Sequence, residues 1–349
     1  VANIVLVSER DRHVLAFGCD PEGDPGNLDP LTIRFSTQES FTVWNALATN
    51  TAGELRVGSG SEIVAAIQTK QQVVVFTDRS VSAMQYIGPP FTFGLAEVST
   101  NTSILGQNAA VAVGDAVYWM GNDVFYRYDG NVSIIPCPVE EFVFDNVNTS
   151  QLSKVTAGSN SEFNEVWWFY SSANSETNDR YVVFNYSDNT WFFGSLDRTA
   201  WDAGGVSGFP IAASPDGNIY FQENGISDGS TNPPSPLNSF VESSGIDVGD
   251  GDQFMSVKRI IPDVGFRNST GTPLVTFTLN ARTYPGSGTT QTESGNTVRT
   301  SSTPLEKYTN QIDVRLRGRS VSLRVESNEV NTQWRLGTPR IDIRPDGRR

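Results

Sequence analysis

Four arginines lie close together near the C-terminal end of the sequence, in a pattern suited to binding anions. Arg315, Arg317 and Arg319 alternate with apolar or small residues, so in a β-strand their guanidinium groups would lie on one face. Arg324 lies in the next alternating run and is expected to join the same face. A guanidinium group pairs with phosphate or carboxylate oxygens, often through two parallel hydrogen bonds. The sequence therefore predicts a basic β surface formed by these four residues.

This basic surface has three interpretations, which the sequence leaves open. It could contact the phosphates of a nucleic acid, although no base-reading motif accompanies it. It could form an interface with an acidic neighbouring subunit. It could also be a solvated strand face that pairs locally with Asp313 and Glu326.

The other chemistry-bearing residues form no recognisable catalytic or metal-binding motif. The chain has a single histidine, His13, which excludes zinc fingers and Ser-His-Asp catalysis. Cys19 and Cys137 belong to no CxxC motif and are expected to be free, buried thiols. The acidic loops 19–30 and 247–252 lack EF-hand spacing and are expected to be exposed turns. The sequence therefore predicts no catalytic residues, no metal site and no cofactor.

Charge is distributed unevenly along the 349 residues, whose formal net charge is −14. Residues 251–349 contain 15 Lys and Arg against 9 Asp and Glu, whereas residues 1–250 contain 10 against 30. A strongly acidic body repels DNA and anionic lipid at long range, so only the last hundred residues would attract them. No apolar run approaches the length needed to span a membrane.

The elements expected to position these residues are almost all β-strands. Short β-branched and aromatic runs, such as 73–76, 117–119 and 166–169, are bounded by Asp, Asn, Gly or Ser. Helix is expected only around 140–144 and 149–154. With 11% aromatic and only 18% charged residues, the chain is neither a coiled coil nor largely disordered. We therefore predict an all-β protein.

A weak internal repeat indicates how these strands are organised. Small-residue strands at Ala66, Ala110, Ala157 and Ala213 each precede an aromatic hairpin, at spacings of 44, 47 and 56 residues. Strands near the axis of a β-propeller are crowded and favour small residues, and the outer strands of each blade favour large ones. The pattern favours a β-propeller over an array of sandwiches or an irregular β domain.

Composition divides the chain into three parts. Residues 1–224 are expected to form the acidic, propeller-like domain. Residues 225–252, rich in Pro, Gly and Ser, are expected to be a linker, and 253–349 a basic domain resembling a β-sandwich or jelly roll. The first residues, VANIVLV, already have the pattern of a buried strand, which indicates a fragment or processed product. An N-terminal portion outside this sequence is then expected to complete the propeller.

Several stretches resemble a family of structural proteins from tailed phages. They are VVVFTDRSVSAMQYIGPPFTFG (73–94), AAVAVGDAVYWMGNDVFYRYDG (109–130), SEFNEVWWFYSSANSETNDRYVVFNYSDNTWFFG (161–194) and WRLGTPRIDIRPDGRR (334–349). The family comprises tail-hub or nozzle and DNA-stabilisation proteins of short-tailed phages, and the resemblance extends over roughly 60–349. It offers no catalytic residues to transfer.

The resemblance implies a virion component without enzymatic activity. Its copies would form a hexameric ring below the portal and adaptor of the phage tail. The ring would surround the DNA channel and help to retain and eject the packaged genome without reading its sequence. The alternative is a carbohydrate-binding or glycan-hydrolysing β-propeller, such as a receptor-binding protein. In that case Trp119, Trp167, Trp168, Trp191 or Trp201 would stack on sugars, but these residues lie in strand-like apolar runs, so packing in the core or between blades is the preferred interpretation.

Overall fold

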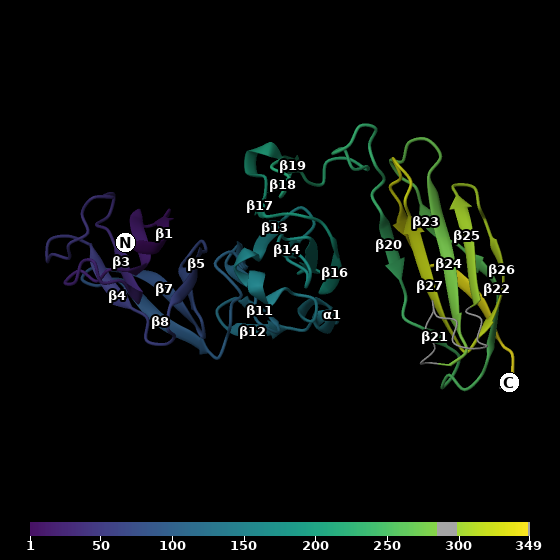
Figure 1. Ribbon diagram of the computed structural model, residues 1–349, viewed down its shortest axis with the longest axis horizontal. Coiled ribbons are helices and arrows are strands. Elements are labelled where there is room, and N and C mark those ends of the chain that lie inside the picture. Colours follow the sequence, from purple (N-terminus) through teal and green to yellow (C-terminus); the bar gives the residue numbers. More distant parts are fainter. Residues whose placement is uncertain (285–298, 348–349) are drawn as a thin grey trace. The chain divides into compact units, whose positions relative to one another are not determined.

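The computed structural model describes residues 1–284 and 299–347 and is nearly all β (Figure 1). The chain divides into two compact units, Val1–Glu223 and Asn224–Arg349, which we call unit 1 and unit 2. The two helical segments expected from the sequence are present as α1 (Glu140–Phe144) and the 3-10 helix η1 (Thr149–Lys154). A further 3-10 turn, η2, spans Gly205–Ser207.

Unit 1 contains five antiparallel sheets in chain order, and within each sheet every strand pairs with the next. Sheet 1 consists of β1 (Ala2–Ser8), β2 (His13–Cys19), β3 (Asp29–Phe35) and β4 (Gly53–Arg56). Sheet 2 consists of β5 (Ile63–Gln68), β6 (Val73–Thr77), β7 (Ser80–Gly88) and β8 (Thr92–Thr100). Sheet 3 consists of β9 (Ala110–Val113), β10 (Ala116–Met120), β11 (Phe125–Tyr128) and β12 (Val132–Ile135). Sheet 4 consists of β13 (Thr156–Asn160), β14 (Glu165–Tyr170), β15 (Arg180–Asn185) and β16 (Thr190–Ser195), and sheet 5 of β17 (Ala200–Asp202), β18 (Ile211–Ala213) and β19 (Ile219–Phe221).

The five sheets are arranged like successive blades of a propeller. The first strands β1, β5, β9, β13 and β17 contact one another in series. The repeat anchors Ala66, Ala110 and Ala157 lie in such first strands, as the sequence predicts. Ala213 does not, because it lies in the middle strand β18, and β17 occupies the first position. The internal repeat does not extend to sheet 1, because β1 lacks the small residues that mark the other first strands.

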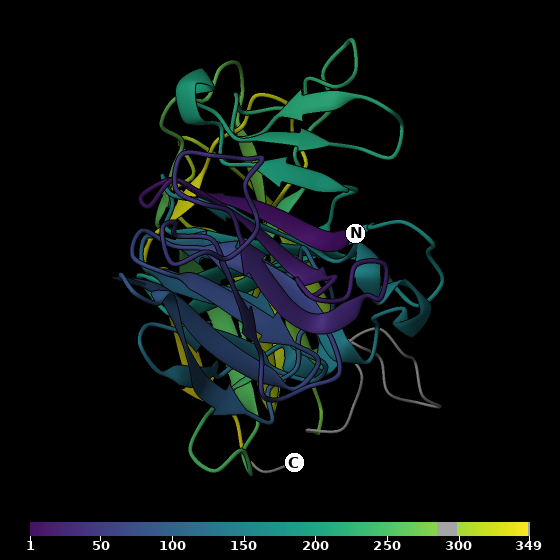
Figure 2. The ribbon, with the colours of Figure 1, turned by 90° about the vertical axis from the view of Figure 1, so that its left-hand side faces the viewer.

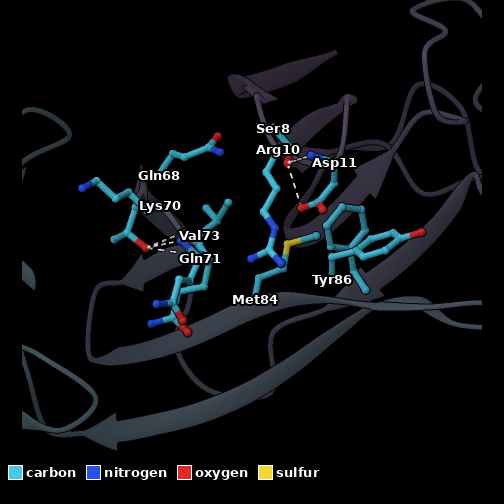
Figure 3. A pocket seen from close by; sticks show the side chains of 12 residues that line it. Ser8, Arg10, Asp11, Gln68, Lys70, Gln71, Val73, Met84 and Tyr86 are labelled. Carbon is cyan, nitrogen blue, oxygen red and sulfur yellow. Dashed lines mark hydrogen bonds between the residues drawn. The ribbon is translucent and has the colours of Figure 1, made fainter. Parts of the chain in front are cut away.

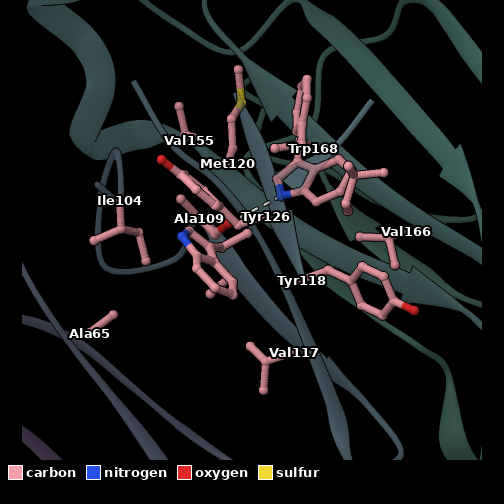
Figure 4. Close-up of a cluster of buried hydrophobic side chains, with 14 of the residues drawn as sticks. Ala65, Ile104, Ala109, Val117, Tyr118, Met120, Tyr126, Val155, Val166 and Trp168 are labelled. Carbon is pink, nitrogen blue, oxygen red and sulfur yellow. Dashed lines mark hydrogen bonds between the residues drawn. The ribbon is translucent and has the colours of Figure 1, made fainter. Parts of the chain in front are cut away.

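Two apolar cores hold these sheets together. The first lies between sheets 1 and 2 and includes Phe17, Ile33, Val75 and Met84. The second joins sheets 2, 3 and 4, and Figure 4 shows part of it around Met120, Tyr126 and Trp168. Burial of such aromatic and β-branched side chains removes apolar surface from water and is the main stabilising contribution to the unit.

Tryptophans pack between sheets or inside the core rather than on an open surface. Trp119 and Trp168 are fully buried. Trp201 of sheet 5 stacks on Trp167 of sheet 4 with ring centroids 5.5 Å apart, and its Nε1 donates to the Ser159 carbonyl. A Cβ at Gly158 would collide with the Trp201 ring, so only glycine permits this approach. Packing, the interpretation preferred from sequence, is thus confirmed for Trp119, Trp168 and Trp201.

Unit 2 is a small β-sandwich. One sheet has the order β20-β27-β24-β25, with β21 also paired to β27, and the other has the order β26-β22-β29. The strands are β20 (Ser239–Glu242), β21 (Ile246–Asp247), β22 (Met255–Ile261), β24 (Leu274–Arg282), β25 (Arg299–Glu306), β26 (Ile312–Gly318), β27 (Ser320–Ser327) and β29 (Arg340–Pro345). A minor pair joins β23 (Val264–Gly265) to β28 (Arg335–Leu336). Met255, Val257, Phe277, Leu316 and Val325 are among the residues that fill the space between the two sheets.

The segment expected to be a linker, 225–252, is partly incorporated into the sandwich. β20 pairs with β27, and the Phe240 ring lies beneath the Arg324 guanidinium. β21 extends the same edge of the sheet. The Pro- and Ser-rich composition concealed these two short edge strands, whose pairing partner lies some 80 residues later in the chain.

Both cysteines are free, as expected, and Cys19 is buried whereas Cys137 is half-buried. Burial raises the pKa of the Cys137 thiol to about 11, so it is protonated and unreactive at neutral pH. Among residues 1–284 and 299–347, no helix has the length and apolar character to cross a membrane.

Candidate functional site

Arg315 and Arg317 lie on the outer face of unit 2, on strand β26. Their neighbours Val314 and Leu316 are buried in the sandwich core, so the alternation predicted from sequence is present. Arg315 is exposed and Arg317 is half-buried. The strand thus directs these two guanidinium groups away from the core.

Strand pairing adds further cations to this surface. Ser256 of β22 lies opposite Arg317 on one side and opposite Arg344 on the other. Arg259 lies between Asp313 and Asp342, and Arg340 lies opposite Ile261. A β-bulge between Val257 and Arg259 adds the exposed Lys258. We define the basic face as the cations Lys258, Arg259, Arg315, Arg317, Arg340 and Arg344 together with Asp313, Asp342 and Asp346.

Only part of the basic face is neutralised locally. Asp342 lies 3.5 Å from both Arg259 and Arg344, and Arg317 donates to Asp346 at 2.6 Å. Exposed pairs of this kind contribute little to stability. Within residues 1–284 and 299–347, Lys258, Arg315 and Arg340 form no ion pair. The basic face therefore retains cations that can receive an anionic partner.

Phe254 supports one edge of the basic face. The Arg317 guanidinium lies 4.3 Å and the Arg319 guanidinium 5.0 Å from the centre of its ring. Arg319 follows β26 in the turn to β27, where its backbone N–H donates to the Arg282 carbonyl. The aromatic ring thus holds two of the four predicted arginines side by side.

The prediction that Arg324 shares this face is wrong. Arg324 lies on β27, which belongs to the opposite sheet of the sandwich. Its guanidinium donates to Glu326 at 2.8 Å and Glu242 at 3.2 Å and lies 4.0 Å from the centre of the Phe240 ring. Burial lowers the pKa of Arg324, but the two carboxylates outweigh burial and raise it overall. Alternation along a strand predicts on which of its two sides a residue lies, but it does not predict which sheet the next strand joins. Here the chain passes from one sheet to the other at Gly318 and Arg319.

Sequence reasoning also missed Lys258, Arg259, Arg340 and Arg344. Each is separated in sequence from the Arg315 strand and joins it only through β22 and β29. The signal available was weak: Arg340, Asp342 and Arg344 alternate with apolar residues in the last strand.

Unit 1 has a small polar hollow between sheets 1 and 2. Its lining includes Ser8, Arg10, Asp11, Gln68 and Lys70 (Figure 3). Its cavity volume of about 10 Å³ is enough for one water molecule. In the part of the chain that the structure describes, no three His, Cys, Asp or Glu side chains gather to hold a metal.

Comparisons with known proteins identify no relatives of this chain by sequence. No protein-family model matches it, and no curated protein matches it. Among solved structures, it is similar to the extracellular domain of the one component system BT4673 from B. thetaiotaomicron, with 11% identity and a TM-score of 0.36. That match covers 63% of this chain but only 32% of the other.

Two further solved structures are similar at comparable distance. The N-terminal domain of Nup159 has 10% identity and a TM-score of 0.34, and the match covers 73% of this chain and 70% of the Nup159 domain. A glycoside hydrolase has 10% identity and a TM-score of 0.28, and the match covers 95% of this chain and 96% of the hydrolase. Similarities this distant carry no argument about the function of this chain.

Proposed function

We propose that this chain is a structural subunit of the tail of a short-tailed phage. Copies of it would form a ring around the DNA channel, as a hub or nozzle within the virion, below the portal and adaptor. The proposal is supported by the resemblance of 73–94, 109–130 and 161–194, which fall in sheets 2, 3 and 4. These are consecutive sheets of one architectural series, and the proposal assigns no residue a catalytic role.

The distribution of charge carries this proposal. Unit 1 contains 26 acidic and 10 basic residues, a net charge of −16. A wall of this sign repels the DNA backbone, so packaged DNA would pass along it without being gripped, whereas Lys and Arg contacts would hold it. A conduit for a packaged genome needs this property.

Unit 2 supplies the complementary charge. Its basic face retains Lys258, Arg315 and Arg340 without ion pairs inside the described ranges, and all three are exposed. We assign this face to contact with the acidic surface of a neighbouring subunit. Such contacts between opposite charges steer association and weaken as salt screens them.

Assembly of the purified 349-residue chain tests the proposal. We expect closed rings in negative-stain images and native mass spectra, and no retention of duplex DNA by unit 1 at physiological ionic strength. The double variant Lys258→Glu/Arg315→Glu should weaken ring formation, and Lys307→Glu, an exposed cation outside the basic face, should not. A chain that never forms rings, or that binds duplex DNA through unit 1, would contradict the proposal.

A second candidate function is binding or hydrolysis of glycans, and one group of side chains favours it. Trp167 is half-buried and donates from Nε1 to Glu165 at 3.0 Å. Burial raises the pKa of Glu165 and of nearby Tyr181, and the charges of Glu165 and Glu223 raise the pKa of Tyr181 further. Carboxyl groups with raised pKa beside an aromatic ring occur in glycosidases. Binding of the monomeric chain to a glycan array, abolished by Trp167→Ala, would favour this function over the first.

A further inference from the structure

His13, the single histidine of the chain, is buried where sheets 1 and 2 meet. It is the first residue of β2, lies across from Ser8 of β1, and exposes none of its surface. Sheet 1, coloured purple, is turned toward the viewer in Figure 2. An imidazole has an ordinary pKa of about 6.5, so its charge can change with pH near neutrality.

Two aromatic rings of sheet 2 enclose the imidazole of His13. The Phe93 ring of β8 meets it edge to face, with ring centroids 5.1 Å apart, and the Tyr86 ring of β7 lies 5.9 Å away. Phe93 is itself buried and packs on Phe35 at the end of β3. These rings exclude water and supply no anion, so a positive charge on the imidazole would be poorly solvated.

The imidazole also contacts the connection between β3 and β4, residues 36–52, which we call the β3–β4 loop. The two ends of this loop are joined, because the Thr51 backbone N–H donates to the Thr37 hydroxyl at 3.0 Å and the two hydroxyl oxygens lie 3.3 Å apart. The Gln38 backbone N–H donates to the Thr51 hydroxyl at 2.8 Å, and His13 Nε2 lies 3.2 Å from the same oxygen. We define the neck of the loop as Thr37, Gln38 and Thr51.

The hydrogen bonds of the neck suit a neutral ring. A threonine hydroxyl accepts two hydrogen bonds and donates one. With a neutral imidazole, the Thr51 hydroxyl accepts from Gln38 and Thr37 and donates its own proton to Nε2. A protonated imidazole carries hydrogen on both nitrogens, so Nε2 would direct a proton at an oxygen whose acceptor positions are already filled. The neck would then have to rearrange.

One carboxylate favours the charged ring, but it does not outweigh burial. Nδ1 forms no hydrogen bond of normal geometry within the described residues, although the backbone and carboxylate of Asp11, in the turn between β1 and β2, lie close enough to favour a proton. Burial has the larger effect and lowers the pKa of His13. The open form of the neck, in which water reaches the ring, therefore binds a proton more readily than the closed form.

The other groups around the ring add no compensating anion. The β3–β4 loop and β8 contribute Thr51 and Phe93, which do not titrate, and β7 contributes the phenol of Tyr86. Further charged groups at this end of the two sheets are two cations that line the polar hollow and one ion pair: Arg10, Lys70 and Arg12 with Glu39 (Figure 3).

We propose that His13 is a pH switch for the β3–β4 loop: protonation of its ring opens the neck. At neutral pH the uncharged ring keeps the neck closed against sheets 1 and 2. The loop carries Phe41, whose side chain is 79% exposed, so opening of the neck alters the position of an exposed aromatic ring. The switch acts within one chain and is independent of the proposed function.

The first experiment follows the ring and the neck in the 349-residue chain. Because His13 is the single histidine, its ring gives one signal in a histidine-labelled NMR sample, and we expect that signal to titrate below its ordinary pKa. Hydrogen exchange at the Gln38 and Thr51 amides, corrected for its intrinsic dependence on pH, should then accelerate in acid. Between the pKa values of the open and closed forms, the acceleration should be about tenfold per pH unit. The amide of Ile33, in the middle of β3, should not respond.

Variants test whether the ring causes this response. His13→Gln cannot gain a charge, so exchange at the neck should no longer depend on pH. Asp11→Asn removes the carboxylate that favours the proton and should move the transition to lower pH. Glu9→Gln removes an exposed carboxylate from the same turn and should leave the transition where it is.

Three results would overturn the switch. They are a ring signal that titrates at or above its ordinary pKa, neck amides whose exchange is unchanged in acid, and acceleration that persists in His13→Gln. Should His13→Gln fail to fold, the opposite behaviour of Asp11→Asn and Glu9→Gln still decides the question, because equal transitions in these two variants would also contradict the proposal.

Discussion

The two units of this chain bury their apolar surface by different strategies. Unit 2 is a two-layer sandwich, in which each sheet covers the inner face of the other and the outer faces are polar. Unit 1 is a series of sheets, in which every sheet needs a neighbour on both sides. A sandwich therefore buries both inner faces by itself, whereas the first and last sheets of the series carry exposed apolar side chains, among them Val5 and Phe221.

The units also differ in charge, and the change of sign falls at the structural division. Unit 1 has a net charge of −16, whereas unit 2 has 15 basic and 13 acidic residues, a net charge of +2. Unit 2 gathers its cations on the outer face of one sheet, where apolar residues are not required. The two kinds of packing leave free surfaces of different chemistry. Unit 1 has apolar side chains exposed at its two end sheets, whereas unit 2 has a basic outer face.

Core truncation should give the largest effect and show whether the units are energetically separate. Trp168→Ala in unit 1 and Phe277→Ala in unit 2 each remove a fully buried ring and should cost about 3–5 kcal/mol. Because each ring lies in a core confined to its own unit, each variant should lower only one of two calorimetric transitions. A single transition that both variants lower together would show that the units unfold as one.

Loss of the close approach between sheets 4 and 5 should give the next largest effect. Gly158→Ala places a methyl group against the Trp201 ring and should destabilise unit 1 by about 1–3 kcal/mol, since overpacking forces the ring to move. Tryptophan fluorescence would report the displacement together with urea denaturation. The control Gly23→Ala introduces a methyl group into open space and should change neither measurement.

Two arginines on opposite sheets of unit 2 should respond differently to truncation. Arg324→Ala removes two carboxylate contacts and the stack on Phe240, and should cost about 1 kcal/mol. Arg315→Ala should change stability by less than about 0.5 kcal/mol, because Arg315 has no ion pair within the described residues. Equal losses in thermal denaturation would refute the assignment of Arg315 to a face kept for a partner.

The smallest expected effect is a pH dependence confined to unit 1. Burial raises the pKa of Glu165, so the folded state holds its proton to a higher pH than the unfolded state does. The stability from this proton is present below the unfolded pKa and is lost as pH rises through the folded pKa. Glu165→Gln should therefore raise the melting temperature of unit 1 at pH 7, and less so at pH 4.

The transition of unit 2 is the internal control for this experiment. Glu165 lies in unit 1, so Glu165→Gln should leave the transition of unit 2 unchanged at both pH values. A gain in unit 1 that is larger at pH 4 than at pH 7 would contradict the assigned shift of Glu165.

The sequence alone determined the features that depend on neighbours along the chain. Alternating apolar residues specified the strands, the short helical segments at 140–144 and 149–154 were placed correctly, and small residues identified the first strands at Ala66, Ala110 and Ala157. These patterns are local because the side-chain period of a strand is two residues.

The tertiary structure alone decided which strands share a sheet and which faces remain uncovered. It placed Arg324 on the opposite sheet from Arg315, brought Lys258 and Arg344 beside Arg317, and left Val5 exposed although its run has the pattern of a buried strand. Strand pairing joins residues far apart in sequence, and the alternation within a strand is the same whichever partner it finds. Alternation therefore indicates that a strand has two different sides, whereas the fold determines what each side contacts.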